Sequence, residues 1–191
     1  DWLRWRSNSF YSRRDNHISY ADGVSDVLLN LYSNERVGAE SEVLGALDIG
    51  TDRVEGHASI SYVRLVDEES LHPEVAAGPE LVNAPEVLYK AGARWLGARA
   101  TVAAQIYAQG PTRRRDTSMV TPEFREVRPD RVPAYMSVDA AAFYRIAGGL
   151  RFGVTASNLF DQRSRIIAPF DSGFDFRVDP RRVFLTLELI Q

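Results

Sequence analysis

The stretch from Arg53 to Leu65 reads RVEGHASISYVRL. Between Val54 and Tyr62 every even position is apolar, glycine or tyrosine, whereas every odd position is charged or polar. Successive side chains of a β-strand point to opposite faces of the sheet. The stretch therefore predicts a strand with one oily face and one charged face.

The same alternation recurs over most of the chain, and no stretch shows convincing helical spacing of its apolar residues. It predicts seven strands and a partial eighth, so the predicted fold class is all-β and antiparallel. The predicted strands are Leu28–Leu47, Arg53–Leu65, Glu86–Trp95, Ala98–Gln109, Ala134–Arg145, Leu150–Phe160 and Arg182–Ile190, with the partial strand at Asp1–Arg6.

The connections between these strands alternate in length. The short ones are Asp48–Asp52, Leu96–Gly97 and Ile146–Gly149, and the long ones lie between Arg6 and Leu28 and at Val66–Pro85, Gly110–Pro133 and Asp161–Arg181. In an antiparallel sheet, alternate connections lie at the same end, so all long loops are expected at one end. Short periplasmic turns and long extracellular loops are typical of bacterial outer-membrane barrels.

The oily face could meet either a protein core or a lipid bilayer. Many of its residues are alanines, such as Ala91, Ala104 and Ala140, whereas soluble cores use larger side chains that fill space. A charge at the midplane of a membrane barrel costs about 2–4 kcal/mol, which would explain why this face is almost free of charge. The exception nearby is Arg64, which stands at a strand end where its side chain could reach the headgroups. The pattern favours a transmembrane barrel.

The charged face is expected to line the inside of that barrel. Its candidate residues are Glu40, Glu42, Glu55, Lys90, Arg94, Arg99, Asp139, Arg145 and Arg151. Tyr62, Trp95 and Tyr144 lie near strand ends, where the aromatic girdles of a membrane barrel belong. The carboxylates are interpreted as salt-bridge partners of the wall or of a plug rather than as acid–base catalysts.

Composition narrows the possible functions. The net charge is −3 with both signs mixed, so no nucleic-acid partner is expected, and the absence of cysteine excludes disulfides and thiolate chemistry. The negative mean hydropathy does not exclude a membrane barrel, because polar lumen residues lower the average. His17, His57 and His72 are far apart in sequence, so neither a metal site nor any cofactor is predicted. No catalytic constellation stands out, and the chain is not expected to be an enzyme.

The last third of the chain carries recognisable motifs. A strand with Pro133-x-Tyr135-x-x-Val138-Asp139 precedes a strand that closes in Asn158-Leu159-Phe160-Asp161, and the final strand opens near Pro180-x-Arg182. Upstream, Tyr32-Ser33-Asn34, Gly38–Glu42 and Asn83-Ala84-Pro85 occur in matching order. Together these motifs resemble the C-terminal barrel portion of TonB-dependent outer-membrane receptors.

The resemblance implies a barrel of about 22 strands with a plugged lumen, of which residues 1–191 would form one segment of about eight strands without the plug domain. It implies an energy-coupled receptor for a scarce ligand, such as a ferric siderophore or cobalamin, in the bacterial outer membrane. The implied partners are outer-membrane lipid and lipopolysaccharide, the missing N-terminal plug, the TonB complex through that plug, and a small-molecule or metal-chelate ligand.

Two alternatives remain open at this point. A self-contained eight-stranded barrel with a structural or adhesive role could fill its interior with side chains and paired lumen charges. A soluble β-binding module would instead turn the apolar face toward a protein core.

Two long loops supply the candidate ligand contacts. They are Arg113, Arg114 and Arg115 in one loop and Phe170, Phe174 and Phe176 in another. The arginines could equally form a solvated tip or contact lipopolysaccharide phosphate, and the aromatics could pack the loops together. Asn158 and Asp161 are expected to be structural, because they end a strand and begin the turn chemistry of a loop.

Overall fold

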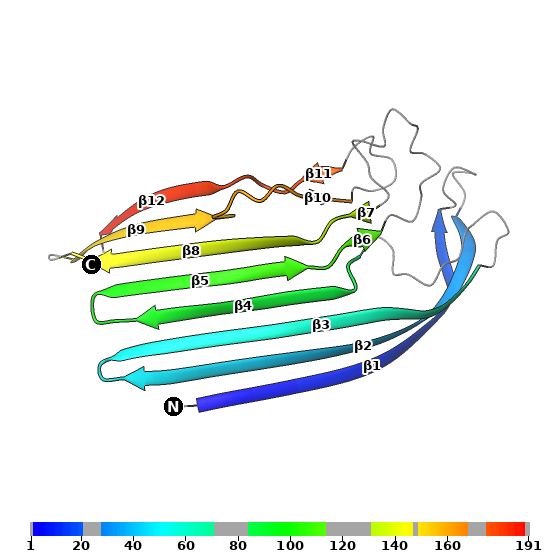
Figure 1. Cartoon of the computed structure of the whole chain (residues 1–191), viewed down its shortest axis with the longest axis horizontal. Helices are drawn as coiled ribbons and strands as arrows, with labels where there is room; N and C mark the ends of the chain where they lie inside the picture. The colour runs from blue at the N-terminus through cyan, green and yellow to red at the C-terminus, as the bar shows by residue number, and fades with distance from the viewer. Residues whose placement is uncertain are drawn as a thin grey trace.

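The computed structural model describes residues 2–20, 28–70, 84–113, 131–146, 149–167 and 175–189. Eight strands form one antiparallel sheet in the order β1-β2-β3-β4-β5-β8-β9-β12 (Figure 1). Their bounds are β1 Trp2–Tyr20, β2 Leu28–Ile49, β3 Asp52–Ser70, β4 Val87–Leu96, β5 Ala100–Gln109, β8 Tyr135–Arg145, β9 Leu150–Ser157 and β12 Arg182–Leu189. Each strand pairs with its neighbours in sequence, and the predicted all-β antiparallel fold is confirmed.

Four short strands form two small ladders beside the main sheet. β6 (Thr112–Arg113) pairs with β7 (Arg131–Val132), and β10 (Arg165–Ile166) pairs with β11 (Phe176–Arg177). They were not predicted, because two-residue strands are too short to show an alternating pattern. No helix in the described part of the chain is long and apolar enough to cross a membrane.

The turns that join β2 to β3 and β4 to β5 lie at one end of the sheet, and the strand ends that the longer connections join lie at the other (Figure 1). The tight turn between β2 and β3 contains Gly50, whose φ of 62° falls in the left-handed region that glycine adopts without a Cβ penalty. Both chain termini lie at this turn end (Figure 1). The predicted sorting of short and long connections to opposite ends is confirmed.

Several strand boundaries were predicted wrongly. β1 continues to Tyr20 rather than stopping at Arg6, so the connection to β2 shrinks to residues 21–27. Most of the added residues are polar at both odd and even positions, which removes the alternation from the sequence but not the ladder of main-chain hydrogen bonds. The strand predicted from Leu150 ends at Ser157, because Asn158 adopts a φ of 48°.

β1, β2 and β3 are much longer than the other strands. They contain 19, 22 and 19 residues, whereas the other strands of the sheet contain between 8 and 11. Residues 11–20, 28–37 and 64–70 therefore run past the last β3–β4 pair, Tyr62 with Val87 (Figure 1). We call these residues the outer extension.

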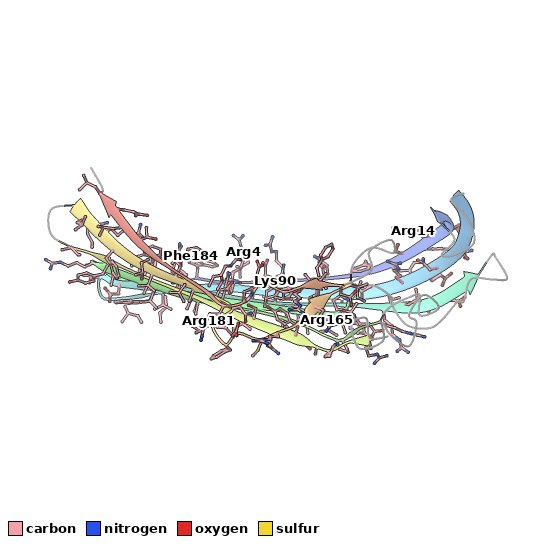
Figure 2. All side chains as sticks on the ribbon, turned by 90° about the horizontal axis from the view of Figure 1, so that it is seen from above. Arg4, Arg14, Lys90, Arg165, Arg181 and Phe184 are labelled. Carbon is pink, nitrogen blue, oxygen red and sulfur yellow. The ribbon has the colours of Figure 1, made fainter. Side chains whose placement is uncertain are left out.

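The sheet has a concave and a convex face. Viewed along its edge, both ends rise toward the same side, and Arg4, Lys90 and Phe184 lie on that concave side (Figure 2). The register places the predicted apolar positions together on the opposite, convex face, for example Val54 beside Trp95 and Trp95 beside Val102. The two faces assigned from sequence are therefore the two faces of one sheet.

The convex face is not covered by protein. Leu185 is 72% exposed and Trp5 68%, and among the described residues only Ala46, Leu65, Val132 and Tyr135 form buried apolar positions. An apolar surface of this extent in a folded protein marks contact with lipid or with another molecule. A soluble module would need a core that the described strands do not form.

The sheet is also open. In the described part, β1 and β12 are its two edges and no pairing joins them. The alternative of a self-contained eight-stranded barrel requires that pairing, because lipid cannot satisfy the main-chain groups of an edge strand. The described strands therefore do not support that alternative.

Candidate functional site

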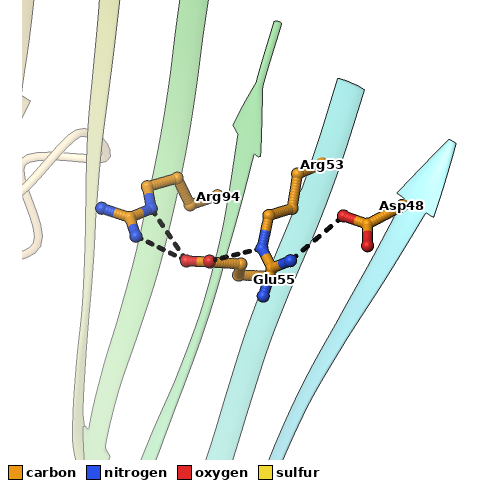
Figure 3. Close-up of polar contacts among 4 residues, drawn as sticks. All are labelled: Asp48, Arg53, Glu55 and Arg94. Carbon is orange, nitrogen blue, oxygen red and sulfur yellow. Dashed lines mark hydrogen bonds and ion pairs between the residues drawn. The ribbon is translucent and has the colours of Figure 1, made fainter. Parts of the chain in front are cut away.

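The concave face is the candidate functional surface, and its turn end carries a network of four charged residues. Arg53 donates from Nη1 to Asp48 (3.1 Å) and from Nε to Glu55 (2.9 Å), and Arg94 donates from Nη2 to the other Glu55 oxygen at 2.5 Å (Figure 3). The β3–β4 register creates the contact between Glu55 and Arg94, because these two residues lie directly opposite each other. The network thus joins β2, β3 and β4 near their turns.

Further ion pairs join strands near the two edges of the sheet. Arg6 on β1 contacts Glu42 on β2 at 2.5 Å, and Arg151 on β9 contacts Glu188 on β12 at 3.4 Å. The Arg151 guanidinium also lies 4.1 Å from the ring centroid of Phe143, an attractive cation–π geometry. These partly exposed pairs add modest stability and fix neighbouring charges in place.

Asp139 has an internal role in the fold. Its carboxylate accepts hydrogen bonds from Gln105 Nε2 at 3.0 Å and from the main-chain N–H of Asn158 at 2.8 Å. The Ser137 hydroxyl lies at 3.5 Å. Asp139 therefore secures the end of β9 against β8.

The Asn158–Asp161 motif joins the end of β9 to the segment before β12. Asn158 is 4% exposed, and its Nδ2 donates to the carbonyls of Gln162 and Asp179, both at 3.0 Å. Its Oδ1 accepts from the Gln162 N–H, while Asp161 Oδ1 accepts from the Arg181 N–H, both also at 3.0 Å. The structural role predicted for this motif is confirmed.

The concave face is hollowed where its side chains are smallest. A hollow of about 650 Å³ has Ala103, Ala141 and Thr155 along its floor, with Trp2 on one edge strand and Phe184 on the other. The Glu55–Arg94 pair, His57 and Gln105 also line it. The small side chains of the middle strands therefore leave open space on this face.

The predicted lumen residues separate into two groups. The register places eight of them on the concave face, and these are Glu40, Glu42, Glu55, Lys90, Arg94, Asp139, Arg145 and Arg151. Arg99 was predicted inside a strand but lies in the turn before β5, where its carbonyl accepts from the Arg145 N–H at 2.7 Å. That this face contacts a plug stays a prediction.

Several of these charges have no opposite partner. Within the described ranges, no ion pair is formed by Glu40, Lys90, Asp139, Arg145 or Arg4, which all lie on the concave face, nor by Arg99 in the turn. Three of the five charges on the face are cationic and two are anionic. The concave face therefore carries charges of both signs that have no ion-pair partner among the described residues.

The ligand-contact candidates are only partly placed. Arg113 lies in β6 and Phe176 in β11, both exposed and both engaged in further contacts, whereas Arg114, Arg115, Phe170 and Phe174 lie outside the described residues. Direct ligand contact by any of the six stays a prediction. No group of three metal-binding side chains occurs among the residues that the structure describes.

Sequence reasoning missed a polar cluster on the outer extension. Asn34 is 3% exposed, and both its Nδ2 and the Nε of Arg36 are buried without a hydrogen-bond partner. Neighbouring Arg13 points to the other face, where it pairs with Asp15 (3.0 Å) and Glu35 (3.4 Å), and its hydrogen bond with Asp15 raises its pKa. Polar residues on both faces hid this difference from the sequence.

Comparison with known proteins agrees with this architecture. The family model described as TonB-dependent receptor-like, beta-barrel matches residues 1–159. No curated protein matches the sequence.

Solved structures share the fold at low sequence identity. The ferric-catecholate import receptor Fiu from E. coli K12, in its closed form, has a TM-score of 0.67 and 20% identity over 97% of this chain and 24% of its own. The siderophore receptor PiuA from Acinetobacter baumannii has a TM-score of 0.68 and 16% identity over 97% of this chain and 26% of its own. The copper transporter OprC has a TM-score of 0.62 and 15% identity over 98% of this chain and 28% of its own.

The chain thus spans less than a third of the length of these proteins. Its open sheet, its sorted connections and its lipid-suited convex face are the features expected of a barrel segment. The chain belongs to the TonB-dependent receptor-like β-barrel family, a family of the bacterial outer membrane.

Proposed function

We propose that the chain forms part of the wall of an outer-membrane receptor that imports a scarce small ligand, such as a ferric siderophore or cobalamin, with energy coupled through TonB. The names of the solved relatives, a ferric-catecholate import receptor, a siderophore receptor and a copper transporter, support a metal-chelate ligand. The longer connections at the outer end would contribute to ligand capture, with Arg113–Arg115 and Phe170, Phe174 and Phe176 as candidates.

The main support for this function comes from the unpaired charges and the hollow on the concave face. Lys90, Arg4 and Arg145 form no ion pair within the described residues, so their charges are available to carboxylates of another domain. A plug domain with carboxylates opposite Lys90, Arg4 and Arg145 would compensate them, and the hollow between Trp2 and Phe184 offers room for its side chains. The paired residues Glu55 and Arg94 would then stiffen the wall, and the unpaired ones would hold the plug.

The height of the apolar band on the convex face fits the thickness of the outer membrane. The ten residue steps from Val54 to Arg64 measure about 33 Å along the strand, which is about 25 Å along the membrane normal at a tilt of about 40°. That is the height of the apolar band of an outer-membrane barrel. Arg64 would then lie at the outer headgroups, where lipopolysaccharide phosphates are its expected partners, as they are for Arg113–Arg115 if these do not touch ligand.

Uptake by cells tests the proposed function. We expect a strain lacking the whole receptor to lose growth on one ferric siderophore, or uptake of cobalamin, and to regain it from a plasmid copy. The same plasmid should fail in a strain without TonB. Full uptake of every metal chelate and of cobalamin in the deletion strain would reject the proposal.

A further inference from the structure

The outer extension carries three hydrogen-bond-donating side chains on the concave side of the sheet. Arg14 on β1 lies directly opposite Asn34 on β2, and Arg36 follows two residues later on β2. Even-numbered residues of β1 and β2 share one face, the face that carries Glu42 and Arg4 nearer the turns. The three side chains therefore project from neighbouring positions on the same side.

Two of these side chains hold buried donors that lack an acceptor. Asn34 is 3% exposed and its Nδ2 makes no hydrogen bond, and the Nε of Arg36 is likewise buried and unpaired. Buried polar groups in folded proteins almost always have a partner, so an unpaired one requires a specific explanation. Two such donors from adjacent positions indicate a place where an acceptor belongs.

The charge around the cluster fits an anion. Within the described part of the chain, neither Arg14 nor Arg36 forms an ion pair. Ser12 and Leu65 lie opposite Arg36 in the two ladders, and Glu68, opposite Asn34, is the one acidic residue paired in register with the cluster. The acidic residues Asp15 and Glu35 are engaged by Arg13.

The position gives access from outside the cell. Arg36 pairs with Leu65, one residue beyond Arg64, which marks the outer limit of the apolar convex band. The outer extension bends toward the concave side of the sheet (Figure 2). A ligand entering the mouth of the barrel would therefore meet these donors before it reached the membrane-embedded wall.

We propose that Arg14, Asn34 and Arg36 form an oxyanion site that binds a carboxylate or phosphate group of the imported ligand. Two guanidinium groups and one amide supply charge-assisted hydrogen bonds to such a group. The inference rests on the proposed function for the identity of the ligand, and it narrows that ligand to one bearing an oxyanion. The site itself is testable without transport.

Binding of simple anions to the purified whole receptor tests the site. The probes are inorganic phosphate and citrate, titrated calorimetrically at constant ionic strength, with chloride as the comparison salt. We expect Arg36→Gln to weaken binding at least tenfold and Arg14→Gln, whose side chain is exposed, to weaken it severalfold. Arg36→Lys keeps the charge but lacks the buried Nε, so we expect it to bind almost as weakly as Arg36→Gln.

Matched variants control for folding and for charge. Arg6→Gln removes an arginine from the same face of β1 nearer its turn end, where it pairs with Glu42, and should leave anion affinity unchanged. Glu68 lies opposite Asn34 in the β2–β3 ladder, so Glu68→Gln should preserve or raise the affinity. Heat-modifiable migration on a detergent gel establishes that each variant is folded.

Three results would overturn the proposal. They are the absence of phosphate and citrate binding by the folded parent, equal binding by the parent and Arg36→Gln, or a loss in Glu68→Gln as large as in Arg36→Gln, which would indicate a bound cation. If anion binding depends on Arg36 but the receptor supports no TonB-dependent uptake, the oxyanion site stands and the proposed function fails. If uptake occurs but anion binding does not, the reverse holds.

Discussion

The two faces of the sheet are formed by the same strands but differ in their content of charged side chains. The convex face, from Val54 to Tyr62 and across to Val183–Leu189, excludes charge because lipid offers no counter-charge or water. The concave face holds charges in every strand of the sheet except β5, and these are either paired within the wall, as Glu55 and Arg94 are, or left unpaired, as Lys90 is. Charge tolerance therefore depends on the face, not on the strand.

The largest difference in stability is expected between an arginine placed on the convex face and an arginine placed at the adjacent position on the concave face. Ala104 lies in mid-strand on the convex face, and its neighbour Ala103 lies on the concave face in the hollow. We expect Ala104→Arg to destabilise the membrane-inserted receptor by about 2–4 kcal/mol. Ala103→Arg should cost much less, because the concave face solvates charge.

Reversible unfolding in lipid vesicles, followed by tryptophan fluorescence, measures both variants. Equal losses for the two arginines would contradict the assignment of faces. Ala104→Leu is the size control and should insert normally.

The next largest loss of stability is expected at Asn158, whose side chain links the end of β9 to the segment before β12. Asn158→Ala removes the hydrogen bonds to Gln162 and Asp179 and leaves buried main-chain groups unpaired, at a cost of about 2–3 kcal/mol. Asn158→Gly loses the same hydrogen bonds but adopts the positive φ without strain. It should therefore be about 1 kcal/mol more stable than Asn158→Ala. Unfolding midpoints in urea measure the difference, and an alanine variant as stable as the parent would exclude the connecting role.

A smaller loss of stability is expected at Gly153 on the concave face, where the absence of a side chain leaves room for the Phe143 ring. A Cβ on Gly153 would come within 2.5 Å of the Phe143 ring, which covers that glycine. We expect Gly153→Ala to cost about 1 kcal/mol, because the ring must move and its contact with Arg151 is lost. Adding Phe143→Leu should recover part of the loss, and a fully additive double variant would show that ring and glycine do not interact.

The smallest stability effect should separate paired from unpaired concave charges. Glu55→Gln removes the carboxylate of Arg94 and one of the two carboxylates of Arg53, so the unfolding midpoint should fall slightly, by less than in Asn158→Ala. Lys90→Gln breaks no ion pair in the described structure, so the midpoint of the barrel should stay unchanged. If Lys90→Gln were the more destabilising of the two, the division of the concave charges into wall and plug-facing groups would be wrong.

Much of the fold follows from pattern alone. The alternation in β3 to β5, β8, β9 and β12 predicted strand, face and approximate bounds, because lipid on one side makes each position either apolar or free to be polar. The same reasoning missed the outer extension of β1 and ended β3 at Leu65 rather than Ser70, although it placed the start of β2 correctly at Leu28. Water reaches both faces there, so side-chain polarity no longer records which way a residue points.

The candidate site was only half predictable for a related reason. Parity placed Glu42, Glu55 and Arg94 on one face, but which charges pair depends on the register between strands. Arg53 and Arg94 both reach Glu55 only because Arg94 lies opposite it in the β3–β4 ladder. The unpaired donors of Asn34 and Arg36 required knowledge of burial, which no local pattern encodes.

The all-β class, the two faces, the alternation of short and long connections and the family could be inferred from the amino-acid sequence, since each depends on periodicity, local turn chemistry or motif. The register, the open edges at β1 and β12, the structural role of Asp139 and the cluster at Arg14, Asn34 and Arg36 could be established only from the folded sheet. These depend on contacts between residues far apart in the chain. The physical reason is that hydrophobic patterning acts on one strand at a time, whereas pairing and burial are properties of the assembled sheet.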